Sequence, residues 1–326
     1  MDIGIISTAD IARGSLIPAL EGSDHDVAAI SSRDADRARA VADEFGIPRS
    51  YGSYEDLLAD DGIDAVYNPL PNGLHAEWTK KAADAGHDVL CEKPLAVDAE
   101  EAREVVDYCE DRGVTLMEAF MYQYHPRTER AVELAREELG EIRSVNASFK
   151  FPLYGRPDDV RLDPDLAGGS LMDVGCYAVS AARLFLGEPE RAYAHTDDSR
   201  DSGVDTELAG VLEYDSGASA RVACGFDTQL VQRYRVEAVD GWIEVRDAFD
   251  APVDEPVELE YEIDGRHGVE TFDAVDQYRL EVDHLEAAVD ADEEPRTGGT
   301  EAIANMRVID ALYESAAAGA PVAVER

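Results

Sequence analysis

Ile3-Gly4-Ile5-Ile6-Ser7-Thr8-Ala9-Asp10-Ile11-Ala12 is the stretch that decides the fold, because an apolar strand, Ile3–Ile6, turns directly into a helix expected over Ile11–Leu20. At such a junction, backbone N–H groups and the positive end of the helix dipole can bind the pyrophosphate of a dinucleotide. Ser7 and Ala9 stand where the pattern G-x-G-x-x-G has glycine, but both are small. Taken alone, the stretch fits a structural turn equally well.

Outward from this stretch, apolar strands and helical segments alternate as far as residue 120. Further strands are expected at 27–30, 65–67, 88–91 and 115–118, and further helices at 35–45, 75–85 and 99–112. Alternation of this kind predicts a parallel sheet covered by helices on both faces. Residues 1–120 are therefore expected to form a doubly wound Rossmann domain that binds a dinucleotide.

Beyond residue 120 the pattern changes to longer segments of alternating polarity. After a helix near 126–139, strands are expected at 142–151, 190–196, 206–214, 219–226, 232–238, 241–246 and 257–263, with helices at 169–186, 278–291 and 301–318. Residues 121–326 are thus predicted to form an α+β domain with a large open, mostly antiparallel sheet. We expect this domain to bind substrate and to mediate oligomerisation.

An apolar face of this second sheet suggests how the chain assembles. Val211, Ala220, Val222 and Val236 are expected on its outer face. An apolar sheet face is usually covered, and a partner subunit is a common cover. We therefore predict a homo-oligomer, a dimer or a tetramer, that forms through the sheet of the second domain.

The charge of the chain restricts its partners. The 71 acidic residues against 29 basic ones give a net charge of −42, spread over the whole length, and lysine stands at only four positions: Lys80, Lys81, Lys93 and Lys150. Nucleic acids and anionic membranes bind through basic side chains, so neither is expected as a partner. Acidity with so little lysine is typical of proteins from extreme halophiles, where abundant salt screens the repulsion. A mesophilic protein with an acidic surface is the alternative.

Several classes of function lack their residue patterns in this sequence. The cysteines Cys91, Cys109, Cys176 and Cys224 form no C-x-x-C pair, the histidines form no H-x-x-x-H or H-x-H pair, and a G-x-S-x-G elbow is absent. Metal and hydrolase chemistry are therefore disfavoured. The chain begins without a basic leader and has no apolar run of about 18 residues, so we expect a soluble, cytoplasmic protein.

The end of the second predicted strand indicates which dinucleotide is bound. A protein that binds the ribose 2′-hydroxyl of NAD usually has Asp or Glu there, whereas this chain has Ser31-Ser32-Arg33. Ser32 and Arg33 can bind a 2′-phosphate, and Arg37 lies one helical turn farther on. NADP is therefore predicted, with weaker use of NAD left open by the adjacent Asp34. The alternative is that Arg33 only starts a solvated helix.

Three polar segments follow the next three strands, where a doubly wound sheet places its ligand. They are Pro69-Leu70-Pro71-Asn72-Gly73-Leu74-His75, Glu92-Lys93-Pro94 and Glu118-Ala119-Phe120-Met121-Tyr122-Gln123-Tyr124-His125-Pro126. We expect all three to face one crevice, at the place where the two domains meet.

These segments resemble the Gfo/Idh/MocA oxidoreductase family over essentially the whole chain. Glu92-Lys93-Pro94 is the most specific mark, and 71–75 supports it. Segments 7–12, 118–122 and 168–177 resemble the branch of NADP-dependent D-xylose dehydrogenases and dihydrodiol dehydrogenases within the family. Together with the acidic composition, they resemble most the D-xylose 1-dehydrogenases of haloarchaea.

Three residues are candidates for the chemistry. Lys93 follows an apolar strand in a chain that avoids lysine, and its ammonium can hold a substrate hydroxyl. Asp173 and Tyr177 are four apart in a predicted helix and so project from one face. The inositol dehydrogenase pattern of the family has histidine at position 177. An ordinary tyrosine titrates near pH 10, so Tyr177 can act as a base only if a cation such as Lys93 stabilises the phenolate.

Each of these residues also has a structural alternative, namely a Lys93–Glu92 pair, a tyrosine packed in the core, and an aspartate paired within the helix. On the functional interpretation, Tyr177 is the acid/base, Lys93 activates it, and Asp173 orients the sugar. His75 is a cofactor contact or, almost equally, a structural histidine. If the Lys93–Pro94 bond is cis, as the resemblance implies, it would direct Lys93 toward the substrate.

The remaining assignments rest on the resemblance and on position in the domain. The predicted cofactor-binding residues are Ser7, Thr8, Ala9, Asp10, Ile11, Ser32, Arg33, Arg37, Pro69, Leu70, Asn72, His75, Glu92, Lys93, Pro94 and Gln123. The predicted substrate-binding residues are Lys93, Phe151, Arg156, Asp173 and Tyr177. Position alone adds Tyr122, Gln123, Tyr154, Arg161 and Phe226 near the sugar.

The resemblance implies NADP-dependent oxidation of an aldopyranose at C1 to the aldonolactone, with D-xylose as the first substrate to test. Oxidation of a trans-dihydrodiol or of another aldose such as glucose is the alternative within the class, since a fold alone does not separate these substrates. An alternative of another class is a non-catalytic sensor that binds NADP.

Overall fold

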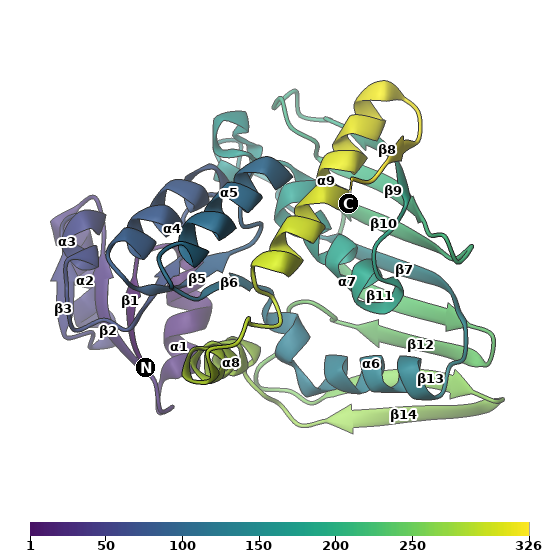
Figure 1. The fold of residues 1–326 in the computed structure, drawn as a ribbon, viewed down its shortest axis with the longest axis horizontal. Helices are drawn as coiled ribbons and strands as arrows, with labels where there is room; N and C mark the ends of the chain where they lie inside the picture. Colours follow the sequence, from purple (N-terminus) through teal and green to yellow (C-terminus); the bar gives the residue numbers. More distant parts are fainter. Residues whose placement is uncertain (326) are drawn as a thin grey trace. The chain divides into compact units, whose positions relative to one another are not determined.

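The computed structural model describes residues 1–325, which separate into two compact units. Unit 1 comprises Met1–Phe120 and Asp276–Ile303, and unit 2 comprises Met121–Val275 and the chain from Ala304 onward. Each unit is built on its own sheet (Figure 1).

The sheet of unit 1 is entirely parallel. Its strands are β1 (Asp2–Ile5), β2 (Asp26–Ser31), β3 (Arg49–Tyr51), β4 (Ala65–Asn68), β5 (Asp88–Glu92) and β6 (Leu116–Ala119), in the order β3-β2-β1-β4-β5-β6. The order reverses between β1 and β4, so the loops after these two strands diverge and leave room for a ligand. The predicted doubly wound fold is confirmed.

Helices connect these strands, and some of them begin at side-chain caps. They are the π-helical turn Ala12–Leu16 with α1 (Ile17–Leu20), then α2 (Ala35–Phe45), α3 (Tyr54–Leu58), α4 (His75–Asp84) and α5 (Ala99–Glu110). The side chains of Asp34, Ser53 and Asp98 accept hydrogen bonds from backbone N–H groups in the first turns of α2, α3 and α5. These caps fix where the chain leaves each strand at the ligand edge of the sheet.

The C-terminal part of the chain returns to complete unit 1. Helix α8 (Gln277–Ala291) buries Val282 and Leu285, and its Asp283 lies 2.9 Å from Nε2 of the buried His25. Farther along, the hydroxyl of Thr297 donates to the carbonyl of Glu118 over 2.6 Å. Residues 276–303, which the sequence pattern grouped with the second domain, thus belong to unit 1. Local periodicity predicts a helix there but not what the helix packs on.

Unit 2 contains a nine-stranded mixed sheet (Figure 1). Its strands are β7 (Ile142–Lys150), β8 (Arg191–Asp197), β9 (Glu207–Glu213), β10 (Ser219–Gly225), β11 (Val231–Ala238), β12 (Gly241–Arg246), β13 (Val257–Ile263), β14 (Arg266–Phe272) and β15 (Val322–Ala323), in the order β14-β13-β12-β11-β7-β10-β9-β8-β15. Among the strands of residues 1–325, only β7 and β10 of this sheet pair in parallel, so the mostly antiparallel sheet is confirmed. The sequence analysis missed β14, whose side chains are largely exposed.

One face of this sheet is covered within the unit itself. Helix α7 (Cys176–Leu186) packs on β7, β10 and β11, and other helices of the unit are α6 (Pro126–Glu137) and the later part of α9 (Gly299–Ala318). Ala220, Val222 and Val236 are buried on this covered side. The expectation that they lie on the outer face is wrong, because the apolar residues of β10 and β11 lie on the side that α7 covers.

The other face of the sheet is exposed and largely polar. Tyr193 and Val211 are paired across β8 and β9 and are 45% and 38% exposed. The same row continues through Arg221 and Asn146 to Arg235, whose guanidinium carbon lies 4.0 Å from the Trp242 ring centroid. This face therefore has an exposed pair, Tyr193 and Val211, at one end of a row that contains two arginines.

Candidate active site

The turn after β1 is shaped for the close approach of another group to its backbone. Ser7 has φ +82°, a left-handed conformation that glycine adopts most easily, and its Oγ accepts from the N–H of Ala9 over 3.3 Å. The helical run then continues from Asp10 to Leu20. Ser7 thus fulfils the backbone role of a glycine, and the first N–H groups of the helix lie directly behind the turn.

Two arginines follow β2, and one of them contacts this turn. Nη2 of Arg37 donates to the carbonyl of Thr8 over 3.4 Å, which links the first turn of α2 to the loop. Arg33 follows β2 and is exposed, and the hydroxyl of its neighbour Ser32 accepts from the N–H of Asp34 over 3.2 Å. Unit 1 therefore brings cationic side chains and the turn after β1 together at one edge of the sheet.

The loop after β4 is held by a buried histidine. The ring of His75 lies between two backbone carbonyls, with Nε2 at 2.6 Å from Leu70 O and Nδ1 at 2.7 Å from Pro94 O. Burial lowers the pKa of His75 to about 4, although the two carbonyls favour the charged form. The imidazole is fully buried, so its contribution to any ligand site is the placement of the segments that contain Leu70 and Pro94.

The other predicted residues of this loop differ in burial. Pro69 and Leu70 are buried at the end of β4, and Asn72 begins a single 3-10 turn that precedes α4. The buried amide of Asn68 donates to the His75 carbonyl and to the Thr79 hydroxyl, each over 3.2 Å. The chain therefore turns sharply from β4 into α4, with its polar atoms satisfied inside the turn.

Glu92 ends β5 near a buried acidic group, and Lys93 follows it. The hydroxyl of Tyr67 donates to Glu92 Oε1 over 2.7 Å, and the N–H of Lys93 donates to Glu92 Oε2 over 3.3 Å. Burial, with a smaller effect of Glu92, raises the pKa of Glu281 well above its usual range. Lys93 itself is partly exposed, and its peptide bond to Pro94 is cis. Lys93 thus directly follows a partly buried acid, Glu92, whose charge acts on the buried Glu281.

Unit 2 contains the other two candidates for the chemistry. Asp173 lies in a π-helical turn, Leu171–Gly175, that leads into α7, and Tyr177 lies in the first turn of α7. Tyr177 is 4% exposed, and its hydroxyl donates to Met121 Sδ over 3.4 Å. Its ring centroid lies 5.5 Å from those of Phe149 and Phe249. An aromatic cluster therefore fixes the direction of the tyrosine side chain.

Asp173 is paired with an arginine from an irregular segment. Nε of Arg161 donates to Asp173 Oδ2 over 2.8 Å. The guanidinium carbon of Arg161 also lies 5.8 Å from the Phe151 ring centroid. Arg156 does not join this group, since its side chain is exposed and lies 3.8 Å from Asp159. Unit 2 therefore brings Asp173, Arg161 and Phe151 together and leaves Arg156 apart.

Gln123 is placed by its hydrogen bonds in unit 2. Its Nε2 donates to the hydroxyl of Ser180 over 3.1 Å, and the amide is buried. The structure thus distributes the predicted residues over both units, with the cofactor-binding set in unit 1 except for Gln123.

Within residues 1–325, no group of three histidine, cysteine or acidic side chains is arranged to hold a metal ion. No described helix combines the length and apolarity that a membrane crossing requires.

Sequence reasoning missed the buried groups around Lys93. Tyr67 lies inside β4, and Glu281 follows it by more than two hundred residues on α8. Glu118 Oε1 accepts from the N–H of Leu95 over 2.8 Å and so fixes the chain just after Pro94. An acid in an otherwise apolar helix face, as at Glu281, is the one signal that could have drawn attention to this cluster.

Comparison with known proteins agrees with the fold. A Rossmann nucleotide-binding model of an oxidoreductase family matches residues 1–120, and the Gfo/Idh/MocA C-terminal domain model matches residues 131–244. A D-xylose 1-dehydrogenase (NADP+) of Haloferax volcanii is 59% identical over 325 residues, which span 100% of both chains.

Solved structures extend this similarity. A 3-ketoreductase from Actinomadura kijaniata, solved with NADP and TDP-benzene, is 33% identical with a TM-score of 0.90 and covers 97% of each chain. An aldose-aldose oxidoreductase from Caulobacter crescentus, solved with glycerol, is 28% identical with a TM-score of 0.92 and covers 99% of each chain. The fold and these relatives define an oxidoreductase with a Rossmann domain. The chain belongs to the Gfo/Idh/MocA family.

Proposed function

We propose that this protein is an NADP-dependent aldose 1-dehydrogenase with D-xylose as its substrate. The observation that carries the proposal is the 59% identity over the full length to a D-xylose 1-dehydrogenase (NADP+), combined with the presence of Lys93, Asp173 and Tyr177. A trans-dihydrodiol or another aldose is the alternative substrate. We place the enzyme in the cytoplasm, where a sugar and a nicotinamide cofactor are both available.

The residues of unit 1 fit NADP. The left-handed turn at Ser7 and the N–H groups behind it suit the pyrophosphate, and the exposed Arg33 with Arg37 suits a 2′-phosphate. Ser32, Thr8 and the segments fixed by His75 complete the set that would hold the cofactor. When bound, NADP+ supplies the acceptor for the hydride that leaves C1 of the sugar.

The chain's own residues would handle the proton and the sugar. Tyr177 takes the proton of the C1 hydroxyl as the C1–H bond breaks, so that the C1–O bond becomes the carbonyl of the lactone. Lys93 holds the hydroxyl oxygen and favours the ionised tyrosine through its positive charge. Asp173 accepts hydrogen bonds from ring hydroxyls and thereby orients C1.

The test is the initial rate of nicotinamide reduction in molar salt with NADP+ and, separately, with NAD+. D-xylose, D-glucose, myo-inositol and a trans-dihydrodiol are compared as substrates. Fast NADP+ reduction with D-xylose is the expected result. Activity with the dihydrodiol alone would replace the substrate, and tight NADPH binding without any turnover would favour the sensor function.

Replacing Arg33 should change the choice of cofactor. Because a charge-assisted hydrogen bond contributes about 1.5 to 3 kcal/mol, Arg33→Ala is expected to raise KM for NADP+ by roughly ten- to a hundredfold. KM for NAD+ should change little. The matched control is Arg39→Ala, which removes an exposed arginine of α2 whose guanidinium pairs with Asp36 at 3.1 Å. Equal changes for both cofactors in Arg33→Ala would contradict the assignment.

We further propose that the chain forms a homo-oligomer, a dimer or a tetramer, through the exposed face of the nine-stranded sheet. Tyr193 and Val211 are paired and exposed on this face, which supports the face as the contact surface between copies of the chain. The net charge of −42 means that copies of the chain repel one another unless salt screens the charge.

Assembly is therefore expected to depend on salt. Sedimentation velocity should show the oligomer in molar salt and a smaller species after desalting, because at low ionic strength the Debye length grows to about 30 Å. Far-UV circular dichroism on the same samples separates dissociation from unfolding. One unchanged species under both conditions would refute the salt dependence.

A further inference from the structure

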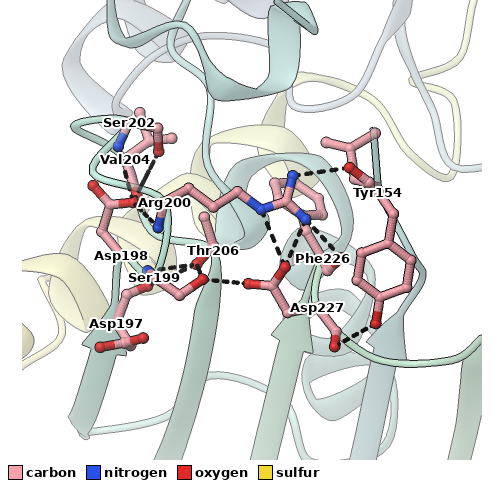
Figure 2. Close-up of polar contacts among 11 residues, drawn as sticks. Tyr154, Asp197, Asp198, Ser199, Arg200, Ser202, Val204, Thr206, Phe226 and Asp227 are labelled. Carbon is pink, nitrogen blue, oxygen red and sulfur yellow. Dashed lines mark hydrogen bonds and ion pairs between the residues drawn. The ribbon is translucent and has the colours of Figure 1, made fainter. Parts of the chain in front are cut away.

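The segment from Phe151 to Gly168 connects β7 to the helical turn that contains Asp173, and its first part is clamped by Arg200. Nη1 of Arg200 donates to Leu153 O over 2.9 Å, and Nη2 donates to Phe226 O over 3.1 Å and to Asp227 Oδ1 over 2.6 Å (Figure 2). The Tyr154 hydroxyl adds a bond of 2.8 Å to the carbonyl of Asp227. Arg200 thus fixes the beginning of the segment to the end of β10.

The far part of the segment is fixed through the backbone of Arg161. Its carbonyl accepts from the N–H of Gly169 over 2.9 Å, and a Cβ placed on Gly168 would lie only 2.5 Å from the same carbonyl oxygen. Position 168 therefore requires glycine for this close approach. Because the backbone on both sides is tightly placed, the Arg161 side chain leaves the segment from a defined point.

Arg161 lies between two carboxylates. Its Nε donates to Asp173 Oδ2 over 2.8 Å, and its Nη1 donates to Asp159 Oδ1 over 3.2 Å. The side chains of Asp173 and Asp159 are 14% and 10% exposed, whereas that of Arg161 is 40% exposed. Within residues 1–325, the side-chain hydrogen bonds of Arg161 are made by Nε and Nη1 and none by Nη2. The guanidinium is thus oriented by two partners, and Nη2 remains as a further donor.

This arrangement places an acceptor and a donor side by side. A carboxylate has about four lone-pair sites, so Asp173 can accept from a ligand hydroxyl while it holds Arg161. A guanidinium is a rigid planar fork, so the position of its Nη2 follows from the Nε contact. Two adjacent ring hydroxyls of a sugar offer the complementary pair, since one donates and the next accepts.

We propose that Arg161 and Asp173 together recognise two adjacent hydroxyls of the sugar ring, which makes Arg161 a specificity-determining residue. This inference rests on the proposed function and adds to it the chemical feature that the substrate must carry, a vicinal diol beside C1. Asp173 accepts from one hydroxyl, and Nη2 of Arg161 donates to its neighbour. If Arg161 only anchored the segment, its replacement would lower kcat/KM by the same factor for every substrate.

The test combines variants with deoxy sugars. Wild type, Arg161→Met and Arg161→Lys are assayed for kcat/KM with D-xylose and with its 2-deoxy, 3-deoxy and 4-deoxy analogues. Arg161→Met is expected to lose about ten- to a hundredfold on D-xylose, the loss typical of a hydrogen bond to a charged group. On the analogue that lacks the hydroxyl contacted by Arg161, Arg161→Met and wild type should have nearly the same kcat/KM, because that contact is already missing in both.

Two comparisons separate recognition from anchoring. Arg200→Met loosens the other end of the same segment and should lower kcat/KM by one common factor for every sugar. Arg161→Lys keeps the charge beside Asp173 but loses the fork, so a folded variant with an intermediate loss on D-xylose is expected. Circular dichroism of each variant confirms that it is folded.

The outcomes are distinct for the two proposals. If wild type oxidises D-xylose but Arg161→Met loses the same factor on all four sugars, the recognition proposal is overturned and the proposed function stands. If wild type oxidises a different aldose, the same variants are compared on the deoxy analogues of that aldose, and an equal loss on all of them overturns the recognition proposal. If wild type oxidises no aldose at all, the proposed function fails and this inference fails with it.

Discussion

Lys93→Met is expected to lower kcat for sugar oxidation by about 10³-fold or more while NADPH affinity changes only a few-fold. The ammonium would both hold the reacting hydroxyl and favour the ionised tyrosine, and acid–base catalysis of this kind contributes about 10²- to 10⁴-fold. Methionine keeps the length of the side chain and removes its charge. Steady-state kinetics give kcat, and titration of the NADPH fluorescence gives the affinity.

Lys80→Met is the matched control for this variant. Lys80 lies at the surface of α4, where its Nζ pairs with Glu104 over 3.2 Å, so its loss should leave kcat within a few-fold of wild type. A Lys93→Met enzyme with nearly normal kcat would show that the lysine is only a structural partner of Glu92. Loss of NADPH binding along with activity would instead place Lys93 in the cofactor site alone.

Tyr177→Phe should lower kcat by about 10²- to 10⁴-fold because it removes the group that takes the proton and leaves the ring in place. The aromatic contacts with Phe149 and Phe249 remain, and the hydroxyl donates to a weak acceptor, the Met121 sulfur. The pH dependence of kcat/KM should lose the limb that requires a deprotonated base.

Tyr234→Phe is the control for the loss of a buried hydroxyl. Tyr234 belongs to the same unit, and its ring centroid lies 6.3 Å from that of Phe249. The variant should keep its kcat and its pH profile. If Tyr177→Phe retained both as well, the tyrosine would be a core residue and another group would have to take the proton.

The main features of the fold could be predicted because its strands and helices have strong local patterns. Buried parallel strands such as β4 and β5 are continuous apolar runs, and Asp34 and Asp98 mark helix starts by capping. The assignment of a sheet face is harder. Alternation in β10 and β11 shows that two faces differ, but which of them α7 covers depends on packing between segments distant in the sequence.

The candidate site shows the same limit. The positions of Lys93, Asp173 and Tyr177 follow from short motifs, so they could be nominated from the sequence. The Arg161–Asp173 pair joins residues of an irregular segment and a helical turn, and no period connects them. The His75 contacts with Leu70 and Pro94 likewise depend on a burial that the sequence does not report.

The division of unit 1 into two stretches of sequence affects how the protein is made. Ribosomes deliver Met1–Phe120 first, but α8 and the segment around Thr297 emerge only after nearly all of unit 2. Until then, His25 lacks Asp283, and the end of β6 lacks its partner at Thr297. The nucleotide-binding unit, although its synthesis begins first, is therefore completed only near the end of synthesis, and cofactor binding during synthesis would report the arrival of residues 276–303.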